Sequence, residues 1–272
     1  MADPSRYADP AFGRAGAAAL FPDVGTHQNL VSLSDLVLSI ADNKQMLGLR
    51  YAEWATRAPS LEADIAAAAM GLDDLGHSRV LFGCLEPLGS DPRGPERESD
   101  PGSLRNLAYF DEPWTQWSQF VAANAILDTA FTAMIEACVG GSVEVLQHRL
   151  RKMLMEERYH FLHGRSWLRS GIDAGPLDRA WKEAIEWFGP PDGETESLHR
   201  EGRLSMGPDQ LRARLEEQLE MKAPSVSVDW KTWDPLRRRG QSGAIDQRTF
   251  AMLRGLEEKK YAPPSAAKQS SV

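Results

Sequence analysis

Two acid and histidine pairs are the residues of this sequence whose types and spacing point most directly to chemistry. Asp74 and His77 stand three residues apart in AAAAMGLDDLGHSRVL, and Glu157 and His160 repeat that spacing in EERYH. Residues three apart share one face of an α-helix, and both of these faces are otherwise apolar. An acid and an imidazole that project from each of two helices into a bundle core are typical of a di-iron or di-manganese site.

Chance supplies some pairs of this kind, since 39 of the 272 residues are Asp or Glu and six are His. Glu196 and His199 match the spacing too, but they follow GPPDG outside the long predicted helices, so we expect no contribution from them. His148 and His163 have no acid three residues earlier, and we expect them at the surface or at the edge of the core.

Two helical hairpins must position these residues. Apolar periodicity predicts four long helices, at 34–57, 61–85, 114–139 and 142–170. Ser34 is a candidate N-cap, and APS and Gly140-Gly141 close the two hairpins. The connection between the hairpins, residues 85–113, is far longer than a hairpin needs. This connectivity predicts an all-α, ferritin-like four-helix bundle, in which two antiparallel hairpins are joined by a long crossover.

The rest of the chain predicts extra C-terminal helices and two irregular ends. Weaker periodicity favours shorter helices near 177–188, 208–221 and 245–258. We therefore divide the chain into an extended N-terminal arm, a ferritin-like helical bundle, a C-terminal helical extension and a disordered tail, at 1–32, 33–190, 191–260 and 261–272.

A bundle site also needs a carboxylate from the third helix, at the same height as the acid and histidine pairs. Height is counted from the turn near residue 141, at a rise of about 1.5 Å per residue. The count places Asp128 close to the level of Glu157, and Asp128 shares an apolar, inward face with Phe131.

The same count on the first hairpin does not give an acid. The position opposite Asp74 is Lys44, which shares an inward face with Val37 and Tyr51. Gln45 and Asp42 are nearby substitutes, and each requires a rotation or an offset of the helix.

Three acids in an apolar core, Asp74, Asp128 and Glu157, need positive charge, because an unpaired buried charge costs several kcal/mol. One divalent metal with a protonated Lys44 would balance them. Lys44 with two protonated histidines and no metal would also do so. Two divalent metals would leave two positive charges for hydroxide or oxo ligands, and charge counting leaves the three arrangements open.

Composition excludes several classes of function. The formal charge is -8, which argues against a general nucleic-acid binder, and we expect the RRR run at 237–239 to be solvated surface, with anion contact as the alternative. Cys84 and Cys138 form no disulfide or zinc pattern. The N-terminus has no apolar run of signal-peptide length and no stretch predicts a membrane span, so we expect a cytoplasmic protein.

The chain resembles the phenylacetic acid catabolic protein family, the ferritin-like A and C subunits of bacterial multicomponent phenylacetyl-CoA epoxidase. The resemblance runs from about residue 34 to 190, and more faintly to 258. It rests on LSIADNKQMLGLRYAEW, RAPSLEADIAAAAMGLDDLGH, ILDTAF, EERYHFLHGRSWL and RRRGQSG. In that family the A-type chain resembles other di-iron monooxygenases and holds the metals, whereas the C-type chain keeps the fold, has lost ligands and acts as a structural partner.

Features of both chain types are mixed here. The ADN and EW phrases and the length resemble C-type chains, but His77 stands where these usually have glutamine, and Glu157 is kept where they often lack the acid. Asp128 falls on the helix-three carboxylate of the family, and the helix-one glutamate is replaced around Lys44 and Gln45. The resemblance implies a divergent paralogue that retains or has adapted a metal site.

Our leading hypothesis from the sequence is an iron-dependent oxygenase component with one or two iron ions, or manganese. It would activate O2 and act on an aromatic or unsaturated substrate such as an acyl-CoA thioester, with electrons from an external flavin and iron-sulfur reductase. By the resemblance, Asp74 and Glu157 would bridge, His77 and His160 would each hold one iron, and Asp128 would be a terminal ligand.

The rival hypothesis is a non-catalytic C-type scaffold that pairs with a catalytic A-type partner, with its polar core satisfied internally and by Lys44. A ferritin-like metal store or an unrelated helical binding protein is the third. The first two imply a homo- or hetero-oligomer with a related ferritin-like subunit. Catalytic residues other than the metal ligands, and the substrate itself, are not identified by the sequence.

Overall fold

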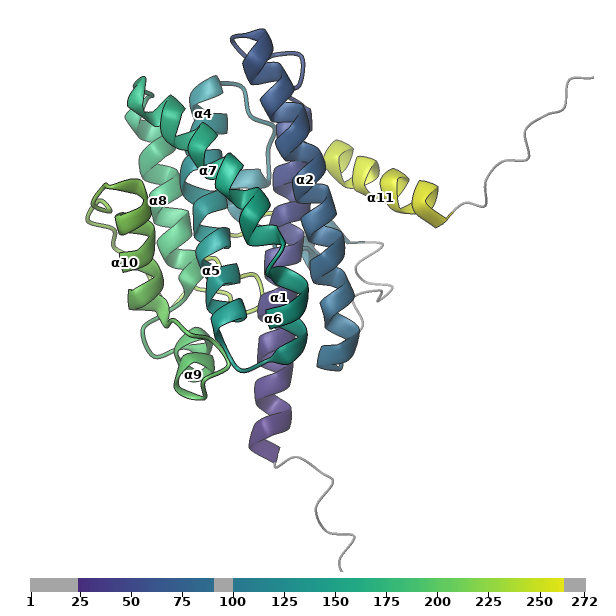
Figure 1. The fold of residues 1–272 in the computed structure, drawn as a ribbon, viewed down its shortest axis with the longest axis vertical. Helices are drawn as coiled ribbons and strands as arrows, with labels where there is room; N and C mark the ends of the chain where they lie inside the picture. The colour runs from purple at the N-terminus through teal and green to yellow at the C-terminus, as the bar shows by residue number, and fades with distance from the viewer. Residues whose placement is uncertain (1–23, 91–99, 262–272) are drawn as a thin grey trace, which may run out of the picture.

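The computed structural model describes residues 24–90 and 100–261. In these ranges the chain is helical and contains no strand, apart from one isolated bridge between Asp234 and Arg239. Figure 1 shows two long hairpins side by side, with C-terminal helices laid against the second hairpin and the last helix of the chain beside the first. The predicted all-α, ferritin-like bundle is confirmed.

The first hairpin consists of α1 (Val24–Ala52) and α2 (Leu61–Leu85), which pack along most of their length. α2 begins where the Ser60 side chain accepts a hydrogen bond from the amide of Ala63, an N-cap of the usual kind. α1 begins ten residues before Ser34, so the expected N-cap at Ser34 is wrong, because the helix continues through that position. The remainder of the predicted N-terminal arm, residues 1–23, lies outside the described residues.

Two glycines set the distance between α1 and α2. A Cβ atom on Gly48 would lie 2.8 Å from the carbonyl oxygen of Gly71, and one on Gly71 would lie 3.0 Å from the carbonyl oxygen of Gly48. The two backbones therefore touch at this crossing. Lys44 lies one turn before Gly48 and Asp74 one turn after Gly71, so this contact also brings those two side chains within reach.

The second hairpin is interrupted in both of its arms. Its first arm is α4 (Trp117–Ala122), the π-helical η4 (Ala123–Asp128) and α5 (Thr129–Gly140), and its second is α6 (Glu144–Leu150) and α7 (Met153–Arg169). The sequence predicts one helix for each arm and misses both interruptions. Here too a glycine sets the spacing, because a Cβ on Gly164 of α7 would lie 2.9 Å from backbone atoms of Ala125 in η4.

The first arm of this hairpin, Trp117–Gly140, is long and apolar enough to cross a membrane, but 89% of its most apolar window is buried inside the protein. A helix buried in this way is the core helix of a bundle.

The long crossover is fastened to α1. It contains η1 (Glu86–Leu88), η2 (Pro101–Ser103) and η3 (Ala108–Phe110), while residues 91–99 are outside the described range. Asp42 accepts a hydrogen bond from the amide of Arg105 at 2.8 Å, and the Asn43 side chain bonds the amide of Leu107 and the carbonyl of Arg105. The ADN motif of α1, residues 41–43, therefore anchors the crossover.

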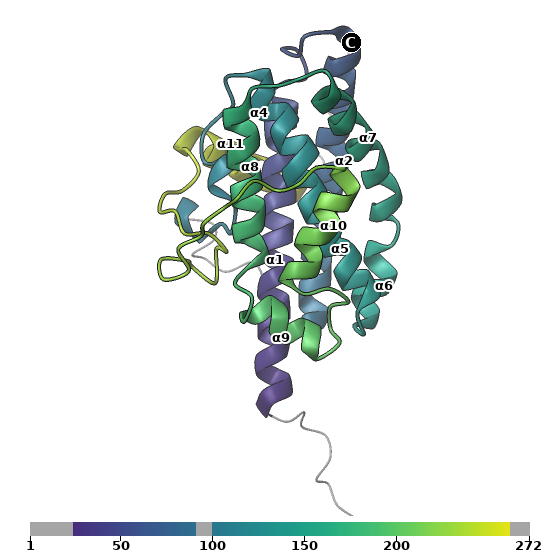
Figure 2. The ribbon, with the colours of Figure 1, turned by 90° about the vertical axis from the view of Figure 1, so that its left-hand side faces the viewer.

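The C-terminal region consists of α8 (Ala174–Phe188), α9 (Glu194–Arg200), α10 (Pro208–Leu219) and α11 (Gln247–Tyr261). α8 and α10 pack against the second hairpin, on the side that faces the viewer in Figure 2. Three of these helices are predicted by the sequence and α9 is not. Glu196 and His199 lie on α9, where they contact Arg200 and the carbonyl of Leu204, so they take no part in the central cluster.

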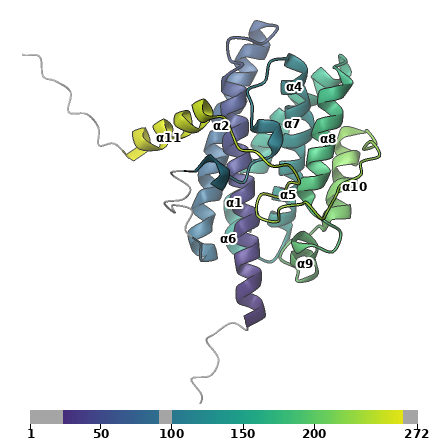
Figure 3. The same cartoon turned by 180° about the vertical axis from the view of Figure 1, so that it is seen from behind.

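The RRR run is not solvated surface, and that expectation is wrong. Arg238 and Arg239 are 2% and 1% exposed. Arg238 donates to the carbonyl oxygens of Trp187 and Phe188, where the negative end of the α8 dipole supplies the charge that a carboxylate would otherwise give. Burial nevertheless lowers the pKa of Arg238 to about 10. The segment that carries these arginines crosses the face shown in Figure 3 and ties the extension to the bundle.

The helix crossing gives a first prediction. Gly48→Ala should lower the free energy of unfolding by about 1–3 kcal/mol, because a methyl group is forced against the backbone of α2. Gly76→Ala is the matched control, since a Cβ there meets nothing within 4 Å and alanine favours the helix. Urea unfolding of both variants checks this, and equal stabilities would contradict the close contact.

Candidate functional site

The structure brings the five sequence-predicted metal ligands and Lys44 into one buried cluster. Asp74 and His77 come from α2, Asp128 from the last position of η4, and Glu157 and His160 from α7. α1 contributes the remaining side chain, Lys44, as the height count predicts. Each of these residues is less than 5% exposed.

Lys44 occupies the centre of this cluster. Its Nζ atom lies 2.9 Å from Oδ1 of Asp74 and 2.5 Å from Oε1 of Glu157, and it also contacts Oδ1 of Asp128. One ammonium group therefore donates to three carboxylates from three different helices, which uses all three of its protons.

The other two candidates for the helix-one position lie elsewhere. Asp42 is fully buried, but it bonds the crossover. Gln45 is partly exposed and, one residue after Lys44, lies about 100° further around the helix. Of the three candidates, Lys44 is the one that reaches Asp74, Asp128 and Glu157.

The two histidines bond the carboxylates from opposite sides. His77 places Nδ1 2.7 Å from Glu157 and Nε2 2.9 Å from Glu156. His160 places Nδ1 3.1 Å from Oδ2 of Asp128, while its Nε2 lies 3.5 Å from Asp73. The rings lie 6.1 Å apart, centroid to centroid.

Several further residues complete the cluster and are missed as site residues by the sequence reasoning. The hydroxyl of Tyr51 donates to Oδ2 of Asp128 at 3.2 Å, and the hydroxyl of Thr132 lies 3.0 Å from Oε2 of Glu157. Tyr51 is seven residues from Lys44 and Thr132 is four from Asp128, so helical spacing could have found both. Asp73 and Glu156 look like ordinary surface acids beside the buried ones, and nothing in their spacing singles them out.

Burial and the neighbouring charges shift the pKa values of Lys44 and Glu157 in opposite directions. Burial disfavours the charged form of Lys44, but Asp128, Asp74 and Glu157 outweigh it and hold its pKa well above the usual value. Burial likewise opposes ionisation of Glu157, yet Lys44 and both histidines hold its pKa well below the usual value. The pKa of Asp128 is raised by burial and by repulsion from Asp74 and Glu157.

Both histidines of the cluster are held in the protonated form. Burial acts against protonation of His77, but hydrogen bonds to Asp74 and Glu157 outweigh it and raise its pKa to about 10. The same balance, with Glu157 and Asp128 as the partners, raises the pKa of His160 to about 9. Lys44 and the two histidines can then supply three positive charges beside Asp74, Asp128 and Glu157.

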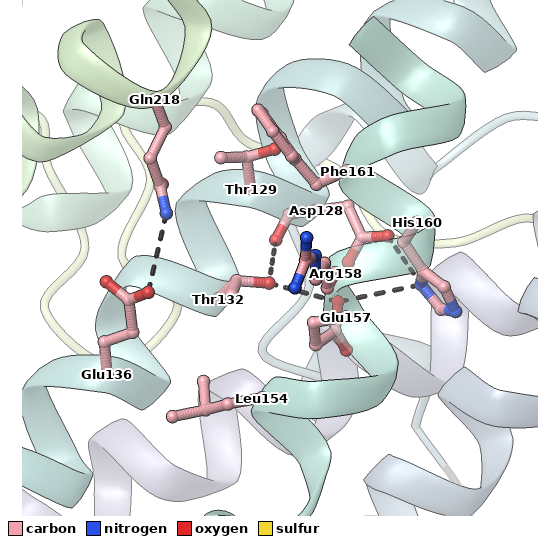
Figure 4. A pocket seen from close by; sticks show the side chains of 10 residues that line it. All are labelled: Asp128, Thr129, Thr132, Glu136, Leu154, Glu157, Arg158, His160, Phe161 and Gln218. Carbon is pink, nitrogen blue, oxygen red and sulfur yellow. Dashed lines mark hydrogen bonds and ion pairs between the residues drawn. The ribbon is translucent and has the colours of Figure 1, made fainter. Parts of the chain in front are cut away.

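A cavity of about 170 Å³ leads to the cluster between α5, α7 and α10. Figure 4 shows Asp128, Glu157 and His160 at one side of it and Glu136 and Gln218 at the other. A water molecule or a small cation fits in this volume, so the acids of the cluster are reachable from outside.

The donor types suit a divalent iron or manganese ion, but the centre of the site does not. Ligand atoms of Asp74, Asp128, Glu157 and His160 all lie within 4.8 Å of one another. The point that the three acids share is filled by Nζ of Lys44, and its raised pKa makes loss of the proton costly. As the side chains lie, a di-metal centre is not compatible with the site.

Comparison with known proteins gives the family. The phenylacetic acid catabolic protein family matches residues 22–267. The chain belongs to this family. It is 25% identical to the C subunit of 1,2-phenylacetyl-CoA epoxidase of Escherichia coli (strain K12), over 81% of this chain and 93% of that protein. It is 24% identical to the A subunit of the same epoxidase, over 54% of this chain and 50% of that protein.

The central ammonium gives a second prediction. Lys44→Met should lower the free energy of unfolding at pH 7 by about 3–5 kcal/mol, because it leaves three buried carboxylates short of one positive charge. Lys152→Met is the matched control, since Lys152 pairs with Glu156 while 79% exposed and should contribute less than about 1 kcal/mol. Chemical denaturation measures both, and a loss no larger for Lys44 than for Lys152 would contradict the central role of Lys44.

The histidines give a third prediction, on pH. Their pKa values are raised above 6.5 by folding, so their stabilisation is complete below pH 6.5 and is lost as the pH rises through about 9 and 10. In EDTA, the free energy of unfolding should fall between pH 7 and 10, by up to about 1.4 kcal/mol per pH unit for each histidine.

Urea unfolding at several pH values tests this, with His160→Gln reducing the slope. His148→Gln is the control, because its side chain is 71% exposed and lies outside the cluster. A free energy of unfolding that is flat, or that rises, over this pH range would show that the histidines are neutral in the folded protein.

Proposed function

We propose that this protein is a non-catalytic, C-type subunit of a phenylacetyl-CoA epoxidase-like complex, acting in phenylacetate catabolism. Its bundle core is closed by Lys44 in place of metal, and it supports a catalytic A-type subunit of the same fold. O2 activation and the electrons from a reductase would then belong to the partner. The family and the relatives support the pathway, and the site supports the C-type role.

The single observation that carries this proposal is the contact of one ammonium with three acids. Nζ of Lys44 bonds Asp74, Asp128 and Glu157, and the two protonated histidines complete the charge balance. Of the three arrangements that charge counting leaves open, this contact supports Lys44 with two protonated histidines and no metal. A metal would have to displace a buried lysine from all three of its partners.

The relatives support the same choice. Identity to the two epoxidase chains is nearly equal, but the match spans 93% of the C-type relative and only 50% of the A-type relative. The match to the C-type relative therefore spans nearly the whole of that chain.

A second candidate, a metal-dependent oxygenase component, is favoured by one observation. Oδ2 of Asp74 and Nε2 of His160 are buried and have no hydrogen-bond partner within the described part of the chain. Buried polar atoms of this kind are rare and point to a water or an ion. If Lys44 swings away, Asp74, Asp128, Glu157 and His160 would hold a single ion, and iron would supply the chemistry with O2.

Metal content separates the two candidates and is the fourth prediction. Wild-type protein from iron-supplemented cells should hold far less than one iron per chain, and His160→Ala should not change that amount. EDTA should leave the melting temperature unchanged, because no ligand is removed from the folded state. Stoichiometric iron that is lost in His160→Ala would overturn the C-type proposal in favour of the oxygenase.

A substitution of Lys44, the residue at the helix-one position, should create iron binding rather than remove it. Lys44→Glu introduces the carboxylate that the family resemblance implies for a metal-holding chain, and removes the ammonium from the centre. We expect it to raise the iron content above that of wild type, whereas Lys152→Glu on the protein surface should not. The wild-type measurement decides the proposal even if the Lys44 variant does not fold.

A further inference from the structure

The exposed apolar side chains of this protein gather on two adjacent helices. Nine large apolar side chains are exposed among residues 33–90 and 100–255, and seven of them belong to α2 and α7. We call them the α2/α7 face: Leu61, Ile65, Leu72, Val80, Met155, Tyr159 and Leu162. On the surface of a soluble protein, exposed apolar residues usually occur singly. Seven of them on one pair of helices therefore require an explanation.

Helical spacing makes these residues one surface. Leu61, Ile65 and Leu72 follow each other at four and seven residues on α2, and Met155, Tyr159 and Leu162 do so at four and three on α7. α2 and α7 are in contact and lie side by side in Figure 1, away from α8 and α10.

Small residues flatten the α2 half of this face. A Cβ on Gly76 would meet nothing within 4 Å, and Ala69, two turns earlier on the helix, is exposed. A partner helix can therefore approach the backbone of α2 closely at this stretch.

Three arginines border the face on both sides. Arg79 stands seven residues after Leu72, and Arg151 and Arg158 stand four before Met155 and Leu162. All three are exposed, and none forms an ion pair with a residue in 33–90 or 100–255. Exposed apolar side chains bordered by charged residues are the usual anatomy of a protein interface, and these three arginines call for acids on the partner.

The rim argues against a second copy of this chain as the occupant. A two-fold interface lays the same surface on itself, so α2 meets either α2 or α7 of the other copy. In the second arrangement Arg79 of one copy lies on the same side as Arg151 and Arg158 of the other, so like charges repel. An acid-rimmed helix pair of another protein neutralises all three arginines.

The size of the face suits a stable contact between two proteins. From Leu61 to Val80 it runs about 28 Å along α2, and two helices are about 20 Å across. The product of these two lengths is about 560 Å². With the surrounding rim added, the area approaches the roughly 800 Å² that each partner buries in a stable interface.

The face also lies over the outer end of the buried cluster. Asp73 and Glu156 stand half-exposed between the two helices, 3.5 Å from His160 and 2.9 Å from His77. A partner seated here would cover the two carboxylates that connect the cluster to solvent.

We propose that the α2/α7 face is where the A-type subunit docks, through a helix pair with an apolar surface and acidic edges. This inference rests on the proposed function and adds to it the surface of the partner contact. The partner's acids pair with Arg79, Arg151 and Arg158, and its apolar side chains cover Leu72 and Tyr159.

The fifth prediction tests this with the full-length chain and the A-type subunit of the same organism, mixed and followed by sedimentation velocity. Leu72→Asp and Tyr159→Asp should each weaken the complex at least tenfold without lowering the melting temperature, because both side chains are exposed. Leu236→Asp is the matched control, since Leu236 is 53% exposed but lies outside the face, and it should leave the affinity unchanged.

Each of the other possible results contradicts a specific part of the docking proposal or of the proposed function. A complex that survives both substitutions overturns the docking face and leaves the C-type proposal standing. No complex with wild-type protein overturns both. A wild-type homodimer that Leu72→Asp converts to monomer, with no binding to the A-type partner, assigns the face to a second copy.

Discussion

The structure depends on one ammonium group in the middle of the bundle. Lys44 donates to Asp74, Asp128 and Glu157 at once, and these acids come from three different helices. A buried ion cluster of this kind contributes little net free energy compared with apolar packing, but removing one member leaves uncompensated charge. Its effect is therefore to fix how the four helices are set against each other, since only one arrangement satisfies every charge.

Close backbone contacts make that arrangement possible. A lysine side chain reaches three helices only if the backbones come nearer than large side chains allow, and Gly48 with Gly71, and Gly164 with Ala125, provide this on both sides of the cluster. The π-helical turn of η4 ends at Asp128, where the extra residue of the turn rotates the helix locally. The crossover, anchored by Asp42 and Asn43, holds α1 in its register.

Much of the fold and of the site follows from the sequence, because helical periodicity is a strong signal and helices have a fixed rise. Counting from the turns places Asp128 opposite Glu157 and Lys44 opposite Asp74, and both pairs meet around one atom. The count does not reveal what fills the centre, since that depends on the conformation of a long side chain among competing charges. The burial of Arg238 and Arg239 is missed for a related reason: their partners are mostly backbone carbonyls and one acid far away in the sequence.

Replacing a metal by a lysine changes what a bundle can do, not only what it binds. An ammonium on a side chain has three protons to donate, no open coordination position and no second oxidation state, so it can satisfy the acids of a metal site without activating O2. It is also covalently attached, so the charge balance does not depend on the supply of a free ion. In the proposed C-type role, the site keeps the part of a metal centre that joins four helices and lacks the part that reacts with O2. The exposed apolar side chains of α2 and α7 lie on the two helices that each contribute an acid and a histidine to the cluster.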